Sequence, residues 1–204
     1  MGDNRFPWQS RAQREDNDWV AQQRGMLAQQ FVNGQALGWM ALEELAHWMH
    51  NSSFAEDMRL FGDMARLRLS AADYLVHGRL WRPPTVAAVA PAAMPAVSVC
   101  DWGDAFSSGT PSCCNMSAVL VSAWLSPAGK VALAMVNHQV SAVTVSIHVT
   151  LPTTPELGLL RLTARELGPG GSRQRVLMRD GTAQLQRTLP GRSAAVVELA
   201  HHEY

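Results

Sequence analysis

Apolar and polar positions alternate most regularly between residues 118 and 151. The final segment, 143–151, alternates aliphatic residues with Thr, Ser and His at every second position. A period of two is typical of a strand that buries one face and leaves the other near solvent. Turn residues at Pro127-Ala128-Gly129 separate this region into successive strands. The pattern therefore predicts a half-buried antiparallel sheet.

Further strand patterns continue to the end of the chain, and turn residues such as Gly168-Pro169-Gly170-Gly171, Asp180-Gly181 and Pro190-Gly191 lie between them. Seven or eight short strands with such turns predict a β-sandwich. The expected strands lie near 97–102, 118–125, 131–137, 143–151, 160–167, 175–178, 183–189 and 194–199.

The first 80 residues show helical patterns instead. One helix is expected to begin near Asp18 and to run to about Gln30. A longer one is expected from Ser53, because Ser53-Phe54-Ala55-Glu56 has the spacing of a capping box, to a stop at Gly78 before Pro83-Pro84. The chain therefore changes from helical to strand patterns near its middle.

Between these helices, residues 31–40 (FVNGQALGWM) have no strong helical stripe and predict a short buried strand. A lone strand between helices would leave its backbone groups without partners, so neighbouring strands are expected outside this chain. The predicted domain division is a mostly helical segment at 1–84, a linker at 85–96 and an antiparallel β-sandwich at 97–200.

Composition excludes some classes of partner. The 17 basic and 17 acidic residues cancel, and nine basic against twelve acidic residues give 1–104 a net charge of −3. Neither half carries the basic surface that nucleic-acid binding requires. The longest apolar tract, 86–99, is too short for a membrane span and is broken by Pro91 and Pro95. We therefore expect neither a nucleic-acid nor a membrane partner.

The three cysteines, Cys100, Cys113 and Cys114, do not have a zinc-ligand spacing. In an oxidising compartment Cys100 could bridge to Cys113 or to Cys114. Three free, partly buried thiols are the alternative that the sequence favours. We predict no metal site and no cofactor.

The order of these elements resembles the C-terminal part of TIM-barrel glycoside hydrolases and hydrolase-like proteins of the α-galactosidase kind. It is similar above all to a bacterial and algal family of such barrels whose activity is unassigned. The segments that carry the resemblance, within residues 20–200, are FVNGQALGW, YLVHGRLWRPP, SAWLSPAGKVALAMVNH and TLPGRSAAVVEL.

This resemblance implies an α+β chain in which the helical remnant of a (β/α)8 barrel C-terminus precedes an all-β antiparallel sandwich. The catalytic carboxylates of the parent glycoside hydrolase would then lie in a missing N-terminal barrel segment. Carbohydrate is the implied partner. The substrate-contact candidates are Asn33, Gln35 and Trp39, because amides can hydrogen-bond to sugar hydroxyls and an indole can stack on a pyranose ring.

Other reactive residues do not form a catalytic set in the sequence. Glycoside hydrolysis needs two carboxyl groups that flank one bond. Glu43 and Glu44 are adjacent on an expected helix and point in different directions, and Asp101 and Asp104 fit a solvated turn. His47 and His50 lie three residues apart without the HExxH order of a metalloprotease. The catalytic residues are therefore unassigned within this chain.

The sequence leads to the hypothesis of a C-terminal fragment of a glycoside-hydrolase-like protein, with a structural β-sandwich that supports a carbohydrate-active barrel and no catalysis by this chain alone. The alternative hypothesis is a non-enzymatic carbohydrate-binding or adhesion β-sandwich module. Segment 31–40 discriminates between them, because a self-sufficient module should bury this segment against its own chain.

Overall fold

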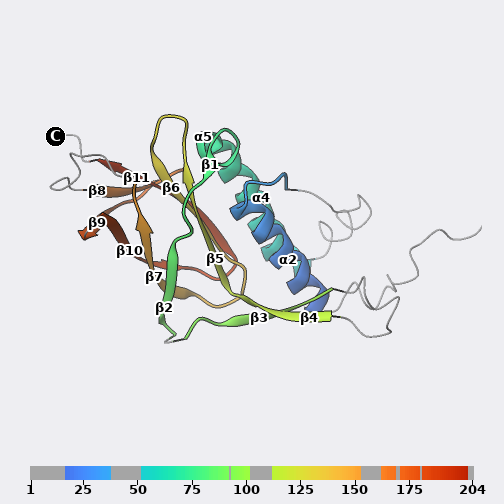
Figure 1. Cartoon of the computed structure of the whole chain (residues 1–204). Helices are drawn as coiled ribbons and strands as arrows, with labels where there is room; N and C mark the ends of the chain where they lie inside the picture. Colours follow the sequence, from blue (N-terminus) through green and yellow to red (C-terminus); the bar gives the residue numbers. More distant parts are fainter. Residues whose placement is uncertain are drawn as a thin grey trace, which may run out of the picture.

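The computed structural model describes residues 17–37, 52–91, 93–101, 112–152, 162–168, 171–179 and 181–201. Strands dominate these residues (Figure 1). The helices are α2 (Asn17–Val32), the 3-10 turn η1 (Ser52–Phe54), α4 (Ala55–Ser70) and α5 (Ala72–Leu75). The strands are β1 (Arg79–Leu80), β2 (Thr85–Ala90), β3 (Ala96–Asp101), β4 (Ser112–Ser117), β5 (Val119–Leu125), β6 (Val131–Asn137), β7 (Val143–Thr150), β8 (Leu162–Glu166), β9 (Arg173–Arg179), β10 (Thr182–Leu189) and β11 (Ser193–His201).

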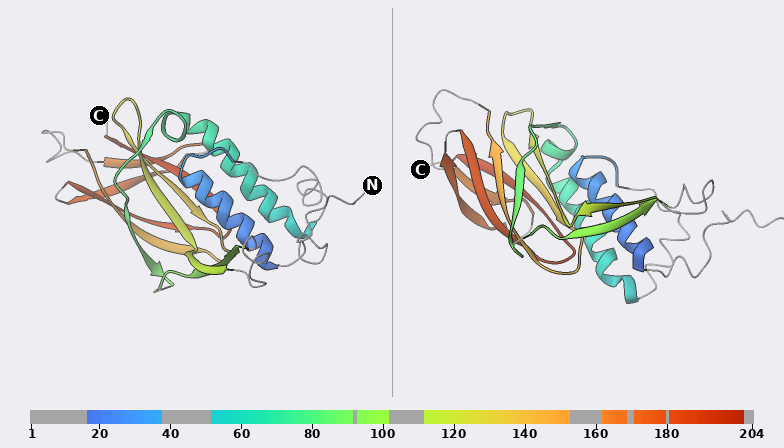
Figure 2. Two further views of the ribbon diagram at one scale, coloured as in Figure 1. Left: turned by 45° about the vertical axis from the view of Figure 1, so that its right-hand side comes forward. Right: turned by 60° about the horizontal axis from the view of Figure 1, so that its bottom comes forward.

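Nine strands form one antiparallel sheet in the order β1-β5-β6-β11-β8-β9-β10-β7-β2, and β3 pairs with β4 in a separate ladder. The sheet curls so that its two halves face each other, with helices α2 and α4 outside one half (Figures 1 and 2). Strands β1 and β2 are consecutive in the chain but lie at opposite ends of the strand order. The segment between them therefore connects the two edges of the curled sheet.

Trp81 holds these two edges together. Its backbone N–H donates to the carbonyl of Ala123 in β5 at 2.8 Å, and its indole Nε1 donates to the carbonyl of Thr150 in β7 at 2.8 Å. Pro83 and Pro84 follow and have no N–H to extend a ladder. A single residue thus bridges the open side of the sheet through its backbone and its side chain. Strand β2 lies within the segment 85–96 that the sequence predicted as a linker.

The interior of the curled sheet is an aliphatic core. In β7, Val143, Val145, Ile147 and Val149 are buried at every second position, and the residues between them are at least partly exposed. This finding confirms the predicted half-buried antiparallel sheet. The other buried members come from both halves of the sheet and include Leu133, Met135, Leu162, Leu185, Leu189 and Val197.

A second core lies between the helices and the outer face of β5, β6 and β11. Leu27, Phe31, Leu60 and Met64 from the helices are buried against small residues of the sheet such as Ala134. The left view of Figure 2 shows α2 and α4 side by side over this face. The helices therefore cover the sheet of their own chain.

The predicted fold class is wrong on this point. The helices are not the remnant of a (β/α)8 barrel, because their apolar faces are buried on the chain's own sheet, and the described residues are mostly β. The predicted strand at 31–40 is also wrong in its described part: Phe31 and Val32 form the last turn of α2. They extend an apolar face that begins with Leu27 and Ala28, at the spacing of a helix.

Gly34 ends α2 in a Schellman motif. Its N–H donates to the carbonyl of Phe31 at 3.0 Å, and the N–H of Gln35 donates to the carbonyl of Gln30 at 2.8 Å. The φ of Gly34 is +64°, a left-handed conformation that disfavours other residues. The VNGQ sequence is therefore a helix stop, and the residues 38–40 at the end of the predicted strand lie outside the described residues.

The predicted long helix from Ser53 to Gly78 is divided in two. Helix α4 begins at Ala55 after η1, so Phe54 rather than Ser53 is at the N-cap, and Arg59 Nη2 donates to Glu56 Oε2 at 2.8 Å within the first turns. The break at Ala71 follows Ser70, whose hydroxyl donates to the carbonyl of Arg66, a bond that bends helices. The break lets α5 direct Tyr74 onto the sheet.

Candidate functional site

The predicted sugar-contact residues lie at the turn that ends α2. Asn33 and Gln35 are exposed there, and Trp39 lies outside the described residues. Arg68 of α4 donates from Nη1 to the carbonyl of Gly34 at 2.7 Å, which fixes the turn against the second helix. The structure therefore places two of the three candidates on the same turn, on either side of Gly34 in the sequence.

Directly beneath this turn, polar side chains of β5 connect α2 to the sheet. The carbonyl of Val32 accepts hydrogen bonds from Ser122 Oγ at 2.5 Å and from Trp124 Nε1 at 3.0 Å. A Cβ on Gly34 would lie 2.5 Å from Cη2 of Trp124, so only glycine fits here. Trp124 is buried and its indole N–H is engaged, so this ring is not available to stack on a sugar.

A second buried connection joins α5 to β11 and β8. Tyr74 Oη donates to Glu198 Oε2 at 2.5 Å, and Arg165 Nη2 donates to Glu198 Oε1 at 2.9 Å. Burial, and then the hydrogen bond to Glu198 and its charge, raise the pKa of Tyr74 well above its usual range. Tyr74 therefore remains a protonated donor, and Glu198 serves as its acceptor.

A third connection joins the two helices to the turn before β11. Arg24 Nη1 of α2 donates to Asp57 Oδ1 of α4 at 2.9 Å, and Arg192 Nη1 lies 3.7 Å from Asp57 Oδ2. Asp57 is 1 % exposed, so its charge depends on these arginines for compensation. Arg59 adds a hydrogen bond from Nη2 to the carbonyl of Arg192 at 3.2 Å.

The Val-Asn-His sequence at the end of β6 makes a fourth connection. Asn137 Nδ2 lies within hydrogen-bond distance of three carbonyls at 2.8 to 3.1 Å: those of Ser141 after β6, of Leu189 at the end of β10 and of Pro190 after β10. His138 is fully buried, and its Nε2 donates to the carbonyl of Ser117 at 2.8 Å. A carbonyl only accepts, so the proton is assigned to Nε2. The two side chains thus fix the end of β6 to neighbouring backbone segments.

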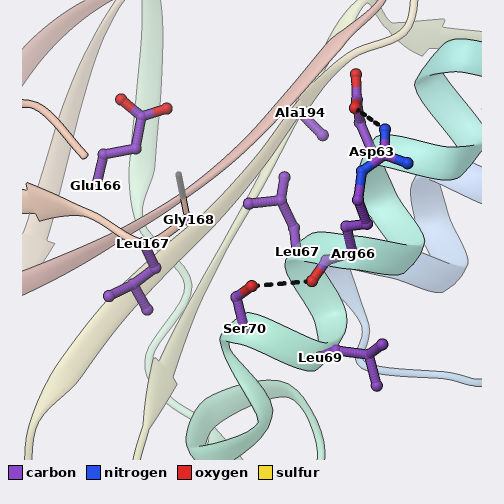
Figure 3. A pocket seen from close by; sticks show the side chains of 9 residues that line it. All are labelled: Asp63, Arg66, Leu67, Leu69, Ser70, Glu166, Leu167, Gly168 and Ala194. Carbon is purple, nitrogen blue, oxygen red and sulfur yellow. Dashed lines mark hydrogen bonds and ion pairs between the residues drawn. The ribbon is translucent and has the colours of Figure 1, made fainter. Parts of the chain in front are cut away.

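Figure 3 shows a groove between α4 and the end of β8. Its volume is about 460 Å³. Apolar and charged residues line it, and they come from α4, from the end of β8 and the segment after it, and from β11. The lining residues are Asp63, Arg66, Leu67, Leu69, Ser70, Glu166, Leu167, Gly168 and Ala194.

The two carboxylates of this groove are engaged in ion pairs. Asp63 Oδ1 lies 2.6 Å from Arg66 Nη2, and Asp63 Oδ2 lies 3.2 Å from Arg59 Nη1. Burial acts to raise the pKa of Glu166, but hydrogen bonds from Arg187 and Ser172 outweigh it and lower the pKa. A general acid in glycoside hydrolysis must carry a proton near neutral pH, which an ionised Glu166 does not.

Most of the other reactive residues weighed in the sequence cannot be placed. Glu43, Glu44, His47 and His50 lie outside the described residues, as does Asp104. In the described part of the chain, no group of three or more His, Cys, Asp or Glu side chains could hold a metal ion. Among the helices that the structure describes, none combines the length and apolar character needed to cross a bilayer.

The polar connections were missed in the sequence because each is formed by residues far apart in the chain. A signal for some of them is visible in retrospect. Ser122 and Glu198 are polar residues within otherwise apolar strands, where burial of a polar group requires a partner. The sequence marks the residues but not the partners.

No protein-family model matches this chain. A search of curated proteins also finds no match.

Proposed function

We propose that this chain is a structural accessory module of a glycoside-hydrolase-like protein, and that the catalytic carboxylates of that protein lie outside it. One observation carries the structural role: the sequence segments that resemble those hydrolases lie at the buried polar connections. The carbohydrate-active character rests on the resemblance alone.

The helix-containing segments support this role. VNGQ forms the Schellman turn whose preceding residue, Val32, accepts hydrogen bonds from Ser122 and Trp124. YLVHG supplies Tyr74, the donor to Glu198. Gly34 from the first motif and Tyr74 from the second thus contribute to docking the helices onto the sheet.

The strand-containing segments support it in the same way. VNH supplies Asn137, whose Nδ2 lies within hydrogen-bond distance of carbonyls in two turns, those of Ser141 and Pro190. In LPGR, a Cβ on Gly191 would lie 1.9 Å from the carbonyl oxygen of Val140, so glycine is needed where two turns touch. Arg192 follows, and its Nη1 lies near Asp57. These identities are explained by packing between turns, without a substrate.

Carbohydrate remains the proposed partner of the whole protein. Asn33 and Gln35 are both exposed at the turn after α2, where their amides could complete one edge of a sugar site formed with another segment. The turn is held by Arg68 and lies over Trp124, so its position would be fixed before a sugar binds.

The first test uses the chain by itself. We expect no hydrolysis of a panel of nitrophenyl α- and β-glycosides and no retention on a glycan array. Turnover by the purified chain would overturn the proposal. Binding to one glycan class that is lost in an Asn33→Ala/Gln35→Ala variant would instead support the stand-alone carbohydrate-binding module.

The second test uses the transcript that encodes the chain. We expect an upstream sequence in the same reading frame that encodes a carbohydrate-active catalytic domain. In that longer protein, Trp124→Leu should lower the melting temperature of this module, whereas kcat/KM per folded molecule should stay unchanged. Val140→Ser, at a site that is 67 % exposed, is the matched control. An unrelated catalytic domain, or none, would contradict the assignment.

A further inference from the structure

Strands β3 and β4 form a two-stranded ladder apart from the nine-stranded sheet. In Figures 1 and 2 this ladder extends from the sandwich alongside α2. Its register is continuous from Ala96 opposite Ser117 to Asp101 opposite Ser112. Within it, Cys100 lies directly opposite Cys113.

The hydrogen-bond pattern of the ladder identifies the type of this pair. The N–H of Ala118 donates to the carbonyl of Pro95 at 2.8 Å, so the pair of Pro95 and Ala118 is a hydrogen-bonded one. Hydrogen-bonded and non-hydrogen-bonded pairs alternate along an antiparallel ladder. Cys100 and Cys113 are five positions further along, an odd number, and therefore form a non-hydrogen-bonded pair.

This type of pair is the closer one. The Cα atoms in a non-hydrogen-bonded pair are about 4.5 Å apart, and a disulfide joins residues whose Cα atoms are about 4.4 to 6.8 Å apart. Cys114 lies opposite Val99 in the neighbouring, hydrogen-bonded pair, on the other face of the ladder. The register therefore separates the two adjacent cysteines, which the sequence could not do.

We propose that Cys100 and Cys113 form a cross-strand disulfide and that Cys114 remains a free thiol. The oxidant is a small-molecule disulfide such as oxidised glutathione. The thiolate of one cysteine attacks it, releases one glutathione thiol and forms a mixed disulfide. The thiolate of the second cysteine then attacks the protein sulfur of that mixed disulfide and releases the second glutathione, so that two protein thiols and one glutathione disulfide yield one protein disulfide and two glutathione thiols.

The bridge would fasten the ends of β3 and β4 that lie farthest from the sandwich. At the other end, Ala118 bonds to Pro95, and His138 donates to Ser117. A covalent link at Cys100 and Cys113 would hold β3 and β4 to each other at this end as well. The register of the two strands carries this inference.

The test measures free thiols after equilibration with an equimolar mixture of reduced and oxidised glutathione. Free thiols are blocked with N-ethylmaleimide and counted from the intact mass. We expect one blocked thiol in the natural chain and three after full reduction. Three blocked thiols without reduction would overturn the proposal.

Single variants resolve which cysteines pair. Cys114→Ser should leave no free thiol, whereas Cys113→Ser should leave two. Equal oxidation of the Cys113→Ser and Cys114→Ser variants would contradict the pairing that the register predicts. Because the two substitutions affect adjacent residues, each is the matched control for the other.

A peptide map of the natural chain gives a second readout that needs no variant. Cleavage before Asp101 and Asp104, without reduction, separates Cys100 from the other two cysteines. We expect the Cys100 peptide to be linked to the peptide that carries Cys113, with the maleimide on Cys114. A linkage to Cys114, with the maleimide on Cys113, would overturn the proposal.

Discussion

The two cores on either side of the sheet differ in how they are specified. The interior of the curled sheet is filled by aliphatic residues such as Leu133, Met135 and Ile147. The layer beneath the helices also contains buried hydrogen bonds and an ion pair, including those of Tyr74 and Asp57. An aliphatic core tolerates rearrangement when its volume is kept, whereas a buried polar group requires one particular partner. The polar connections therefore select one position of the helices on the sheet.

Strand β6 takes part in both cores, because it is buried on both faces. Its larger residues, Leu133 and Met135, contribute to the interior, and Ala132 and Ala134 lie beneath the helices. Small residues on the outer face allow the helices to approach the strand closely. The comparison between the two cores can thus be tested within one strand.

The largest effect is expected from breaking the ion pair of the helix layer. Asp57→Ala would leave Arg24 buried without its carboxylate, and we expect a loss of about 3 to 5 kcal/mol in the free energy of unfolding. Urea denaturation measures this loss. The control is Asp63→Ala on the same helix, whose ion pairs are partly exposed and should contribute at most about 1 kcal/mol. Similar losses for both variants would contradict the distinction.

In the interior, Leu133→Ala should cost about 3 kcal/mol, because it removes a fully buried side chain and leaves a cavity. Val136→Ala, on the outer face of the same strand, removes fewer atoms and should cost about 2 kcal/mol. Both values come from urea denaturation of the two variants. A larger loss at Val136 would show that the helix layer is packed more tightly than the interior.

The connection between α5 and β11 is tested by Tyr74→Phe. The substitution keeps the ring but removes the donor to Glu198, which retains only the bond from Arg165. We expect a loss of about 2 kcal/mol in the free energy of unfolding, the range for hydrogen bonds to charged groups. Thr85→Val, which removes a hydroxyl at an exposed position on β2, is the control. An unchanged stability of Tyr74→Phe would show that Glu198 has found another donor.

The smallest effect on the free energy of unfolding is expected from the protonation of His138. Burial is the main reason that the pKa of His138 lies below its ordinary 6.5; the hydrogen bond to Ser117 opposes this shift, and the charge of Arg24 adds to it. The unfolded chain therefore binds the proton more readily. The stability contribution is complete above about pH 6.5 and decreases as the pH falls below that value.

This dependence can be measured as the slope of unfolding free energy between about pH 7.5 and about pH 5.5. His138→Gln should flatten the slope, even if it also lowers stability at every pH. His148→Gln, at a half-buried position on β7, controls for the general removal of a histidine. A slope of the natural chain that His138→Gln leaves unchanged would assign the proton uptake to another group.

The strands could be predicted from local sequence because the alternation of apolar and polar residues identifies the buried face of a strand within a few residues. The period of two in 143–151 is sufficient to place β7, and Pro127-Ala128-Gly129 is sufficient to place the hairpin between β5 and β6. The helices that cover the sheet were harder to predict from the local sequence. Segment 31–40 was predicted as a strand because its two glycines interrupt the pattern, although Phe31 and Val32 continue the apolar face of α2.

The sequence by itself determined the mainly antiparallel sandwich, the apolar alternation of its interior and most of its turns, because these depend on neighbours within a few residues. Only the tertiary structure decided that the helices cover this sheet, that Glu198 accepts from Tyr74 and that Cys100 lies opposite Cys113. Each of these depends on residues that the chain brings together from far apart. The partner of a buried polar group is set by the geometry of the whole fold, so a local sequence pattern cannot identify that partner.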